Sequence, residues 1–78
     1  MNANSQTYGL TRRELEVLHL MAEGLTQKEI ANKLFVSRYT VNSHVQHIYE
    51  KMDARTGPHA VNKAYRARII LVPDISLN

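Results

Sequence analysis

A helix-start pattern that occurs three times in the first half of the chain constrains its fold more than any other feature. Thr11 is followed three residues later by Glu14, and Thr26 is followed in the same way by Glu29. In such a capping box, the threonine hydroxyl and the glutamate carboxylate each accept a hydrogen bond from the other residue's backbone N–H. Ser37 is a third N-cap of this kind, although no glutamate follows it. These helix starts predict an all-helical chain.

The spacing of apolar residues and helix-ending residues predicts four helices. Gly24 ends the first, and Pro58 lies in the first turn of the fourth, where its missing N–H costs nothing. The expected helices cover about 12–23, 27–34, 38–52 and the stretch from the Thr56 cap to Ala67 or Arg68. We expect residues 8–72 to form one domain between two flexible segments, 1–7 and 73–78.

Each expected helix has apolar residues that recur on one face, which predicts the side that packs inward. The third helix shows this most clearly, because its apolar positions follow one another at intervals of four, three and four residues. The apolar stretch 69–72 is expected to return to the core. The predicted inward residues are Leu15, Leu18, Met21 and Ala22, then Ile30, Ala31 and Leu34, then Val41, Val45, Ile48 and Met52, and finally Ala60, Val61, Ala64 and Tyr65.

Composition excludes several classes of protein. The 78 residues include no cysteine, so disulfides and thiolate metal sites are absent, and the four histidines are not spaced as a zinc set. We expect no metal and no cofactor. The sequence shows no catalytic residues, because it lacks a Ser/His/Asp set, paired carboxylates and a glycine-rich phosphate loop. With neither an apolar leader nor a membrane-length apolar run in this sequence, we expect a non-enzymatic cytoplasmic protein with no membrane partner.

The net charge of +3 is small, but the charges are unevenly distributed. Residues 32–49 contain no acidic side chain and hold Lys33, Arg38, His44 and His47. A basic stripe on one element suggests a polyanionic partner. A solvated face that is basic for no functional reason explains the charge equally well.

The second and third expected helices are separated by about three residues, which forces them to cross steeply. This is the helix-turn-helix arrangement, in which the second helix of the pair enters the major groove of DNA.

The outward face of the third helix suits a duplex. Opposite the buried stripe lie mainly neutral polar groups, and Asn and Gln can pair with adenine through two hydrogen bonds. The expected base-reading residues are Tyr39, Asn42, Ser43 and Gln46. The residues expected to contact phosphates are Lys28, near a helix N-terminus, and Arg38, Thr40, His47 and Lys51, on the flanks of the third helix.

The residues from Leu10 to about Leu71 resemble the LuxR/GerE family of bacterial helix-turn-helix regulators. The resemblance rests on Leu10-Thr-Arg-Arg-Glu14, Leu18, Gly24-Leu-Thr-Gln-Lys-Glu-Ile-Ala31, Leu34, Ser37, Thr40-Val41, His44-Val45, Ile48 and Lys51-Met52. It implies a four-helix domain whose third helix reads DNA. It also implies a homodimer on a partly palindromic site, paired through the fourth helix and its residues Ala60, Val61, Ala64 and Tyr65.

The resemblance also implies roles for single residues. In the family, the positions of Asn42, Ser43 and Gln46 face bases, and those of Lys28, Thr40, His47 and Lys51 lie near phosphates. Glu14 matches a glutamate that is tied to the core by a salt bridge. His44 matches a partly buried histidine, and it is expected to be structural or to touch a phosphate.

Some positions depart from the family pattern. Asn42 and Gln46 stand where basic residues are common, which predicts a different target sequence. Asp53 stands where glycine often ends the recognition helix, but aspartate tolerates the left-handed backbone conformation better than most residues. Gly57 and Pro58 replace a commoner Arg-Thr pair at the start of the fourth helix.

The sequence therefore predicts specific binding to double-stranded DNA by a bacterial transcription regulator, either alone or as the C-terminal domain of a longer protein. The alternative is an interaction module whose basic third helix docks on an acidic partner such as an RNA polymerase subunit. The neutral face of Asn42, Ser43 and Gln46 favours base edges over an acidic partner.

Overall fold

Every predicted helix start carries its cap in the computed structural model, which describes residues 7–71. The Thr11 and Thr26 hydroxyls each accept a hydrogen bond from the backbone N–H three residues on, at 3.1 Å, and the paired glutamates complete both capping boxes. Ser37 accepts from the Thr40 N–H at 3.0 Å, and Thr56 accepts from the His59 N–H at 3.2 Å.

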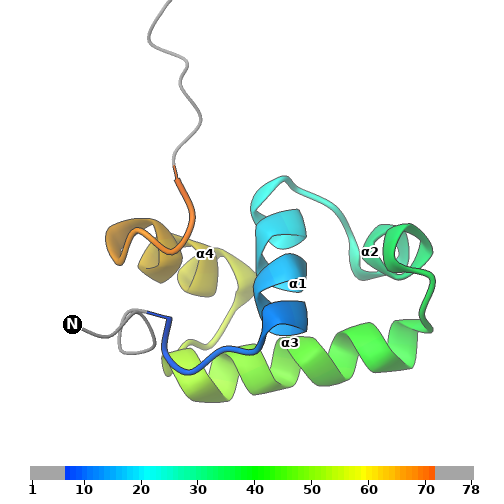
Figure 1. Ribbon diagram of the computed structural model, residues 1–78, viewed down its shortest axis with the longest axis horizontal. Coiled ribbons are helices and arrows are strands. Elements are labelled where there is room, and N and C mark those ends of the chain that lie inside the picture. Colours follow the sequence, from blue (N-terminus) through cyan, green and yellow to red (C-terminus); the bar gives the residue numbers. More distant parts are fainter. Residues whose placement is uncertain (1–6, 72–78) are drawn as a thin grey trace, which may run out of the picture.

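Four helices make up the described residues, and none of these residues lies in a strand. They are α1 (Arg12–Ala22), α2 (Gln27–Leu34), α3 (Arg38–Met52) and α4 (Gly57–Arg66). The all-helical prediction is confirmed, with α1 and α4 ending slightly earlier than expected. In Figure 1, α1 stands at the centre between α2 and α4, and α3 runs beneath all three. No helix in the described range is long and apolar enough to cross a membrane.

The core lies between α3 and the three helices above it. The predicted stripe of α3, from Val41 to Met52, is buried as expected. The predicted face of α1 is partly wrong, because Val17 and Leu20 are buried beside Leu18 while Leu15, Met21 and Ala22 are only half-buried. The physical reason is that α1 packs against all three other helices, so its burial is not confined to one face.

The fourth helix needs a second correction. Ala60 and Ala64 are fully buried inside this chain and offer no surface to a second copy. Val61 and Tyr65 are half-buried. Beyond α4, Ile70 returns to the core as predicted for this stretch, whereas Leu71 is exposed.

The expected flexible segments and Val72 lie outside the described residues, apart from Thr7. The Thr7 carbonyl accepts a hydrogen bond from the Leu10 N–H at 2.9 Å.

Two helices end in a left-handed residue. Asp53 closes α3 at φ 53°, which confirms that aspartate can replace glycine at this cap. Phe35 closes α2 at φ 60°, which the sequence did not reveal, because phenylalanine seldom adopts this conformation. Its side chain is 93% exposed, so packing against the fold does not explain its presence.

Candidate nucleic-acid interface

One long face of α3 is free of the other helices. In Figure 1, α1, α2 and α4 all lie on the same side of α3, which leaves its opposite side uncovered. Val41 and Val45 hold the N-terminal half of α3 in the core. Between them, Asn42 is exposed and Ser43 is half-buried, and Gln46 beyond them is exposed. The structure thus brings three of the predicted base-reading residues onto a helix whose backbone is fixed by its buried face.

The start of α3 is held by a local network. The Ser37 hydroxyl donates to Thr40 Oγ1 at 3.0 Å and accepts from the Thr40 N–H. Thr40 is half-buried and its hydroxyl is engaged by Ser37, whereas Arg38 is exposed. Tyr39, the fourth predicted base-reading residue, is 83% exposed. No acidic residue follows in α3 until Glu50.

The N-terminus of α2 lies beside this face. Gln27 Nε2 donates a hydrogen bond to Asn42 Oδ1 at 3.5 Å, which links the first residue of α2 to α3. Lys28, the next residue, is exposed. Gln27 was not among the predicted site residues, because it and Asn42 are fifteen residues apart and no pattern in the sequence marks their contact.

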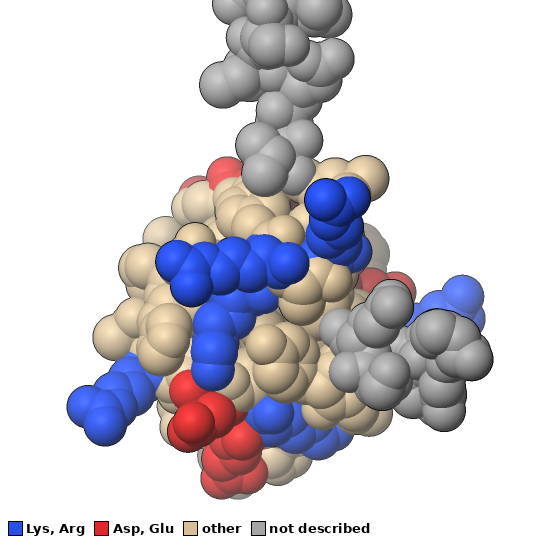
Figure 2. All heavy atoms as spheres, turned by 90° about the vertical axis from the view of Figure 1, so that its left-hand side faces the viewer, with Lys and Arg blue, Asp and Glu red and all other residues tan. Residues whose placement is uncertain are grey.

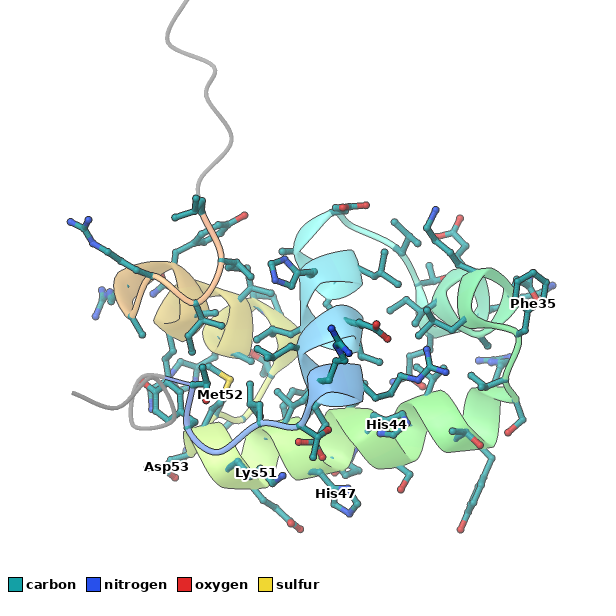
Figure 3. The ribbon with its side chains drawn as sticks, viewed as in Figure 1. Phe35, His44, His47, Lys51, Met52 and Asp53 are labelled. Carbon is teal, nitrogen blue, oxygen red and sulfur yellow. The ribbon has the colours of Figure 1, made fainter. Side chains whose placement is uncertain are left out.

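The C-terminal half of α3 is tied to α1 through Glu14, as the resemblance implied. The Glu14 side chain is buried, and Lys51 Nζ donates to its Oε1 at 2.8 Å. His47 Nδ1 lies 3.6 Å from Glu14 Oε2. Lys51 also donates to the Gly9 carbonyl at 3.2 Å. Figure 3 shows His47 and Lys51 on α3, with Phe35 at the right-hand end of the molecule.

These contacts set the charge state of Glu14. Burial by itself would raise the pKa of the Glu14 carboxyl. The hydrogen bonds from Lys51 and the Thr11 N–H, together with the positive charges of Lys51 and His47, outweigh burial and hold the pKa below its ordinary value of 4.5. Glu14 is therefore ionised near neutral pH.

The predicted phosphate-contacting residues fall into two groups. Lys28 and Arg38 are exposed, and their side chains make no hydrogen bond or ion pair with another described residue. His47 and Lys51 share the Glu14 carboxylate. His44 is half-buried, as the resemblance implied.

A comparison with family models decides what this arrangement is. The model for bacterial regulatory proteins of the luxR family matches residues 8–64. The chain belongs to the luxR family. It is a helix-turn-helix DNA-binding domain of a non-enzymatic family that acts in transcription regulation.

Individual relatives support the same family assignment. The domain is 44% identical over 61 residues to the oxygen regulatory protein NreC of Staphylococcus carnosus and to that of Staphylococcus haemolyticus. The match covers 78% of this chain but 28% of each NreC protein. The crystal structure of ChrA, a response regulator in a heme-sensing two-component system, matches with a TM-score of 0.76 at 38% identity. That match covers 78% of this chain and 30% of ChrA.

The luxR domain has a second cationic region at its α4 end. Figure 2 shows Lys and Arg side chains spread over this face. Residues 54–71 hold Arg55, Lys63, Arg66 and Arg68 and no acidic residue. Lys63 is engaged, because its Nζ donates to the carbonyls of Met52 at 2.7 Å and Asp53 at 3.2 Å and so helps to close α3.

Proposed function

We propose that this luxR-family domain reads specific duplex sequences with the N-terminal half of α3 in the major groove, and thereby directs a bacterial transcriptional regulator to its sites. The observation that carries this proposal is the neutral polar set of the exposed Asn42 and Gln46 and the half-buried Ser43, on a helix whose opposite face is fully buried. A rigid helix holds these groups at fixed positions, which base-edge recognition requires. Tyr39 extends the same surface toward the start of α3.

Phosphates on both sides of the groove complete the proposed contact. Lys28 and Arg38 are exposed and stand at the N-terminal ends of α2 and α3, where cationic side chains and helix N-termini both favour an anion. Thr40, His47 and Lys51 are proposed to line the phosphates as well. For Lys51 this contact competes with Glu14, so its contribution to affinity is smaller than that of a free lysine.

We also propose a homodimer through α4 when the domain is bound to DNA. With Ala60 and Ala64 buried, Val61 and Tyr65 are left to form the contact. Arg55, Arg66 and Arg68 near this helix make pairing of two free copies unfavourable, and DNA phosphates offset that repulsion. The Val61→Glu variant is expected to abolish two-fold cooperative binding while leaving a folded monomer, which sedimentation on and off DNA measures.

The partners beyond DNA are inferred from the family. We expect this regulator to act in the bacterial cytoplasm. It would affect RNA polymerase either by contacting the enzyme or by occupying DNA near the promoter. The match spans 28% of the NreC length, and we propose that the domain acts either alone or as the DNA-binding part of a longer regulator. The name NreC supports a response to oxygen in that relative, and we propose no signal for this chain.

Selection of bound duplexes from a random-sequence pool tests the proposal. We expect an enriched sequence with two-fold symmetry and a steep loss of affinity as salt rises. A pool that stays random, with weak binding to all duplexes, would overturn base reading and favour the interaction-module alternative. In that case, the domain should instead bind an acidic protein such as an RNA polymerase subunit.

A further inference from the structure

The contact between Gln27 and Asn42 joins two residues whose backbones are both fixed. Gln27 follows the Thr26 cap, whose capping box with Glu29 closes at 2.8 and 3.1 Å. Asn42 follows Val41, which is fully buried. Gln27 Nε2 donates to Asn42 Oδ1 at 3.5 Å across the two helices. The relative position of the two amides therefore depends on the packing of α2 against α3 and not on a flexible loop.

This hydrogen bond couples the orientation of the Asn42 amide to that of the Gln27 amide. Turning the Asn42 amide alone by half a turn would place its Nδ2 against Gln27 Nε2, so that two donors would face each other. Only a turn of both amides together restores a hydrogen bond. In the orientation present, Oδ1 accepts from Gln27 and keeps a second lone pair, while both Nδ2 hydrogens remain available to other acceptors. Asn42 thus presents a donor and an acceptor at defined positions.

A fixed amide separates adenine from guanine. In the major groove, adenine offers the N7 acceptor beside the N6 donor, which matches an amide in one orientation. Guanine offers two acceptors, N7 and O6, so the Asn42 oxygen would oppose one of them. The amide opposes one of the two guanine acceptors with its oxygen in either orientation, so guanine gains little from a held amide, whereas adenine gains because a held amide need not be ordered on binding.

We propose that Gln27 is a specificity-determining residue of the DNA interface, which orients Asn42 so that the pair favours adenine over guanine. This inference rests on the proposed function of α3. Gln27 acts through Asn42 and is a positioning residue. The contribution of this exposed hydrogen bond to folding is small compared with that of the apolar core.

The test begins with the duplex that the unmodified domain selects. The base pair read by Asn42 is the one at which Asn42→Ala abolishes preference, and a second duplex carries guanine in place of adenine there. The affinity ratio between the two duplexes is measured for the unmodified domain, for Gln27→Met and for the control Asn32→Ala. Gln27→Met keeps the side-chain length and removes the donor. Asn32→Ala removes another exposed amide from the same helix.

We expect Gln27→Met to reduce the adenine-to-guanine ratio by about three- to tenfold, which corresponds to one hydrogen bond, and Asn32→Ala to leave it unchanged. In an Asn42→Ala background, Gln27→Met should have no further effect on the ratio. Gln27→Glu should also lower the ratio, because a carboxylate only accepts and so favours the reversed amide. Thermal unfolding should show that each variant is folded.

An unchanged ratio in Gln27→Met, or an equal fall in the Asn42→Ala background, would overturn the inference. Failure of Asn42→Ala to change any base preference would overturn it too. These outcomes differ from a failure of the proposed function, in which the unmodified domain selects no sequence at all.

Discussion

The two halves of α3 differ in what their polar side chains do. In the N-terminal half, Asn42 and Gln46 are exposed, and the bond that engages Asn42 comes from the neighbouring surface residue Gln27. In the C-terminal half, His47 and Lys51 converge on the buried Glu14 of α1. One helix thus carries a surface available for reading and a segment that anchors it.

The largest expected effect is on stability, at the anchor. Glu14→Ala removes the partner of Lys51 and the carboxylate that accepts from the Thr11 N–H. Because Lys51 is partly solvated, we expect a loss of about 2–4 kcal/mol in the free energy of unfolding, less than for a fully buried pair. Urea unfolding measures it. A loss below about 0.5 kcal/mol, typical of ordinary surface substitutions, would show that Glu14 anchors nothing.

The anchor also predicts how stability depends on pH. Since the pKa of Glu14 is lowered by folding, its contribution is present above the ordinary value of 4.5 and is lost as pH falls through the lowered value. The melting temperature should therefore fall on acidification below about pH 5. In Glu14→Gln, the melting temperature should start lower at neutral pH and fall less steeply. Parallel curves for the two proteins would contradict the role given to Glu14.

Substitutions in the N-terminal half of α3 should weaken DNA binding and leave the stability of the domain nearly unchanged. Asn42→Ala and Gln46→Ala should each cost about 1–3 kcal/mol in binding to the best duplex and relax base preference at one position. Stability should change by less than about 0.5 kcal/mol, because both side chains are exposed. Binding titrations and thermal unfolding measure the two quantities. An equal loss on every duplex would mean that these residues do not read bases.

Salt dependence compares a free cation with an anchored one. Arg38→Ala should reduce the slope of log affinity against log salt by about one unit, the value for one phosphate contact. Lys51→Ala should weaken binding to every duplex. If this variant also reduces the salt slope by nearly one unit, Lys51 leaves Glu14 for a phosphate when the domain binds DNA. Should Lys51→Ala leave the slope intact, Lys51 would belong to the anchor alone.

The smallest expected effect concerns the left-handed residues that end α2 and α3. Phe35→Asn should stabilise the domain by up to about 1 kcal/mol, because asparagine adopts this conformation more readily and the exposed ring loses no packing. Asp53→Asn is the matched control and should change little, since aspartate already tolerates the conformation. Chemical unfolding of both variants measures the difference. Destabilisation by Phe35→Asn would show that the ring does contribute to the fold.

Much of this architecture could be predicted from the sequence, because its signals are local. The caps at Thr11, Thr26 and Ser37 mark helix starts, and the spacing from Val41 to Met52 gives the buried face of α3. Such signals involve residues within one helix, where geometry is fixed by the backbone.

The remaining features depend on how the helices pack. The burial of Val17 and Leu20 follows from the central position of α1, which a single-face pattern does not indicate. The Gln27–Asn42 bond joins two helices and has no periodic signal. In the same way, a lysine on a basic helix predicts a phosphate contact, and only the position of Glu14 shows that Lys51 has a partner within the chain.

NMR titration of the domain with its selected duplex tests whether the N-terminal half of α3 reads DNA while the C-terminal half anchors the helix to α1. The side-chain amide resonances of Asn42 and Gln46 and the backbone from Tyr39 to Gln46 should shift most. The Glu14 backbone should shift least. Shifts concentrated on α4, or no larger at Asn42 and Gln46 than elsewhere, would contradict it.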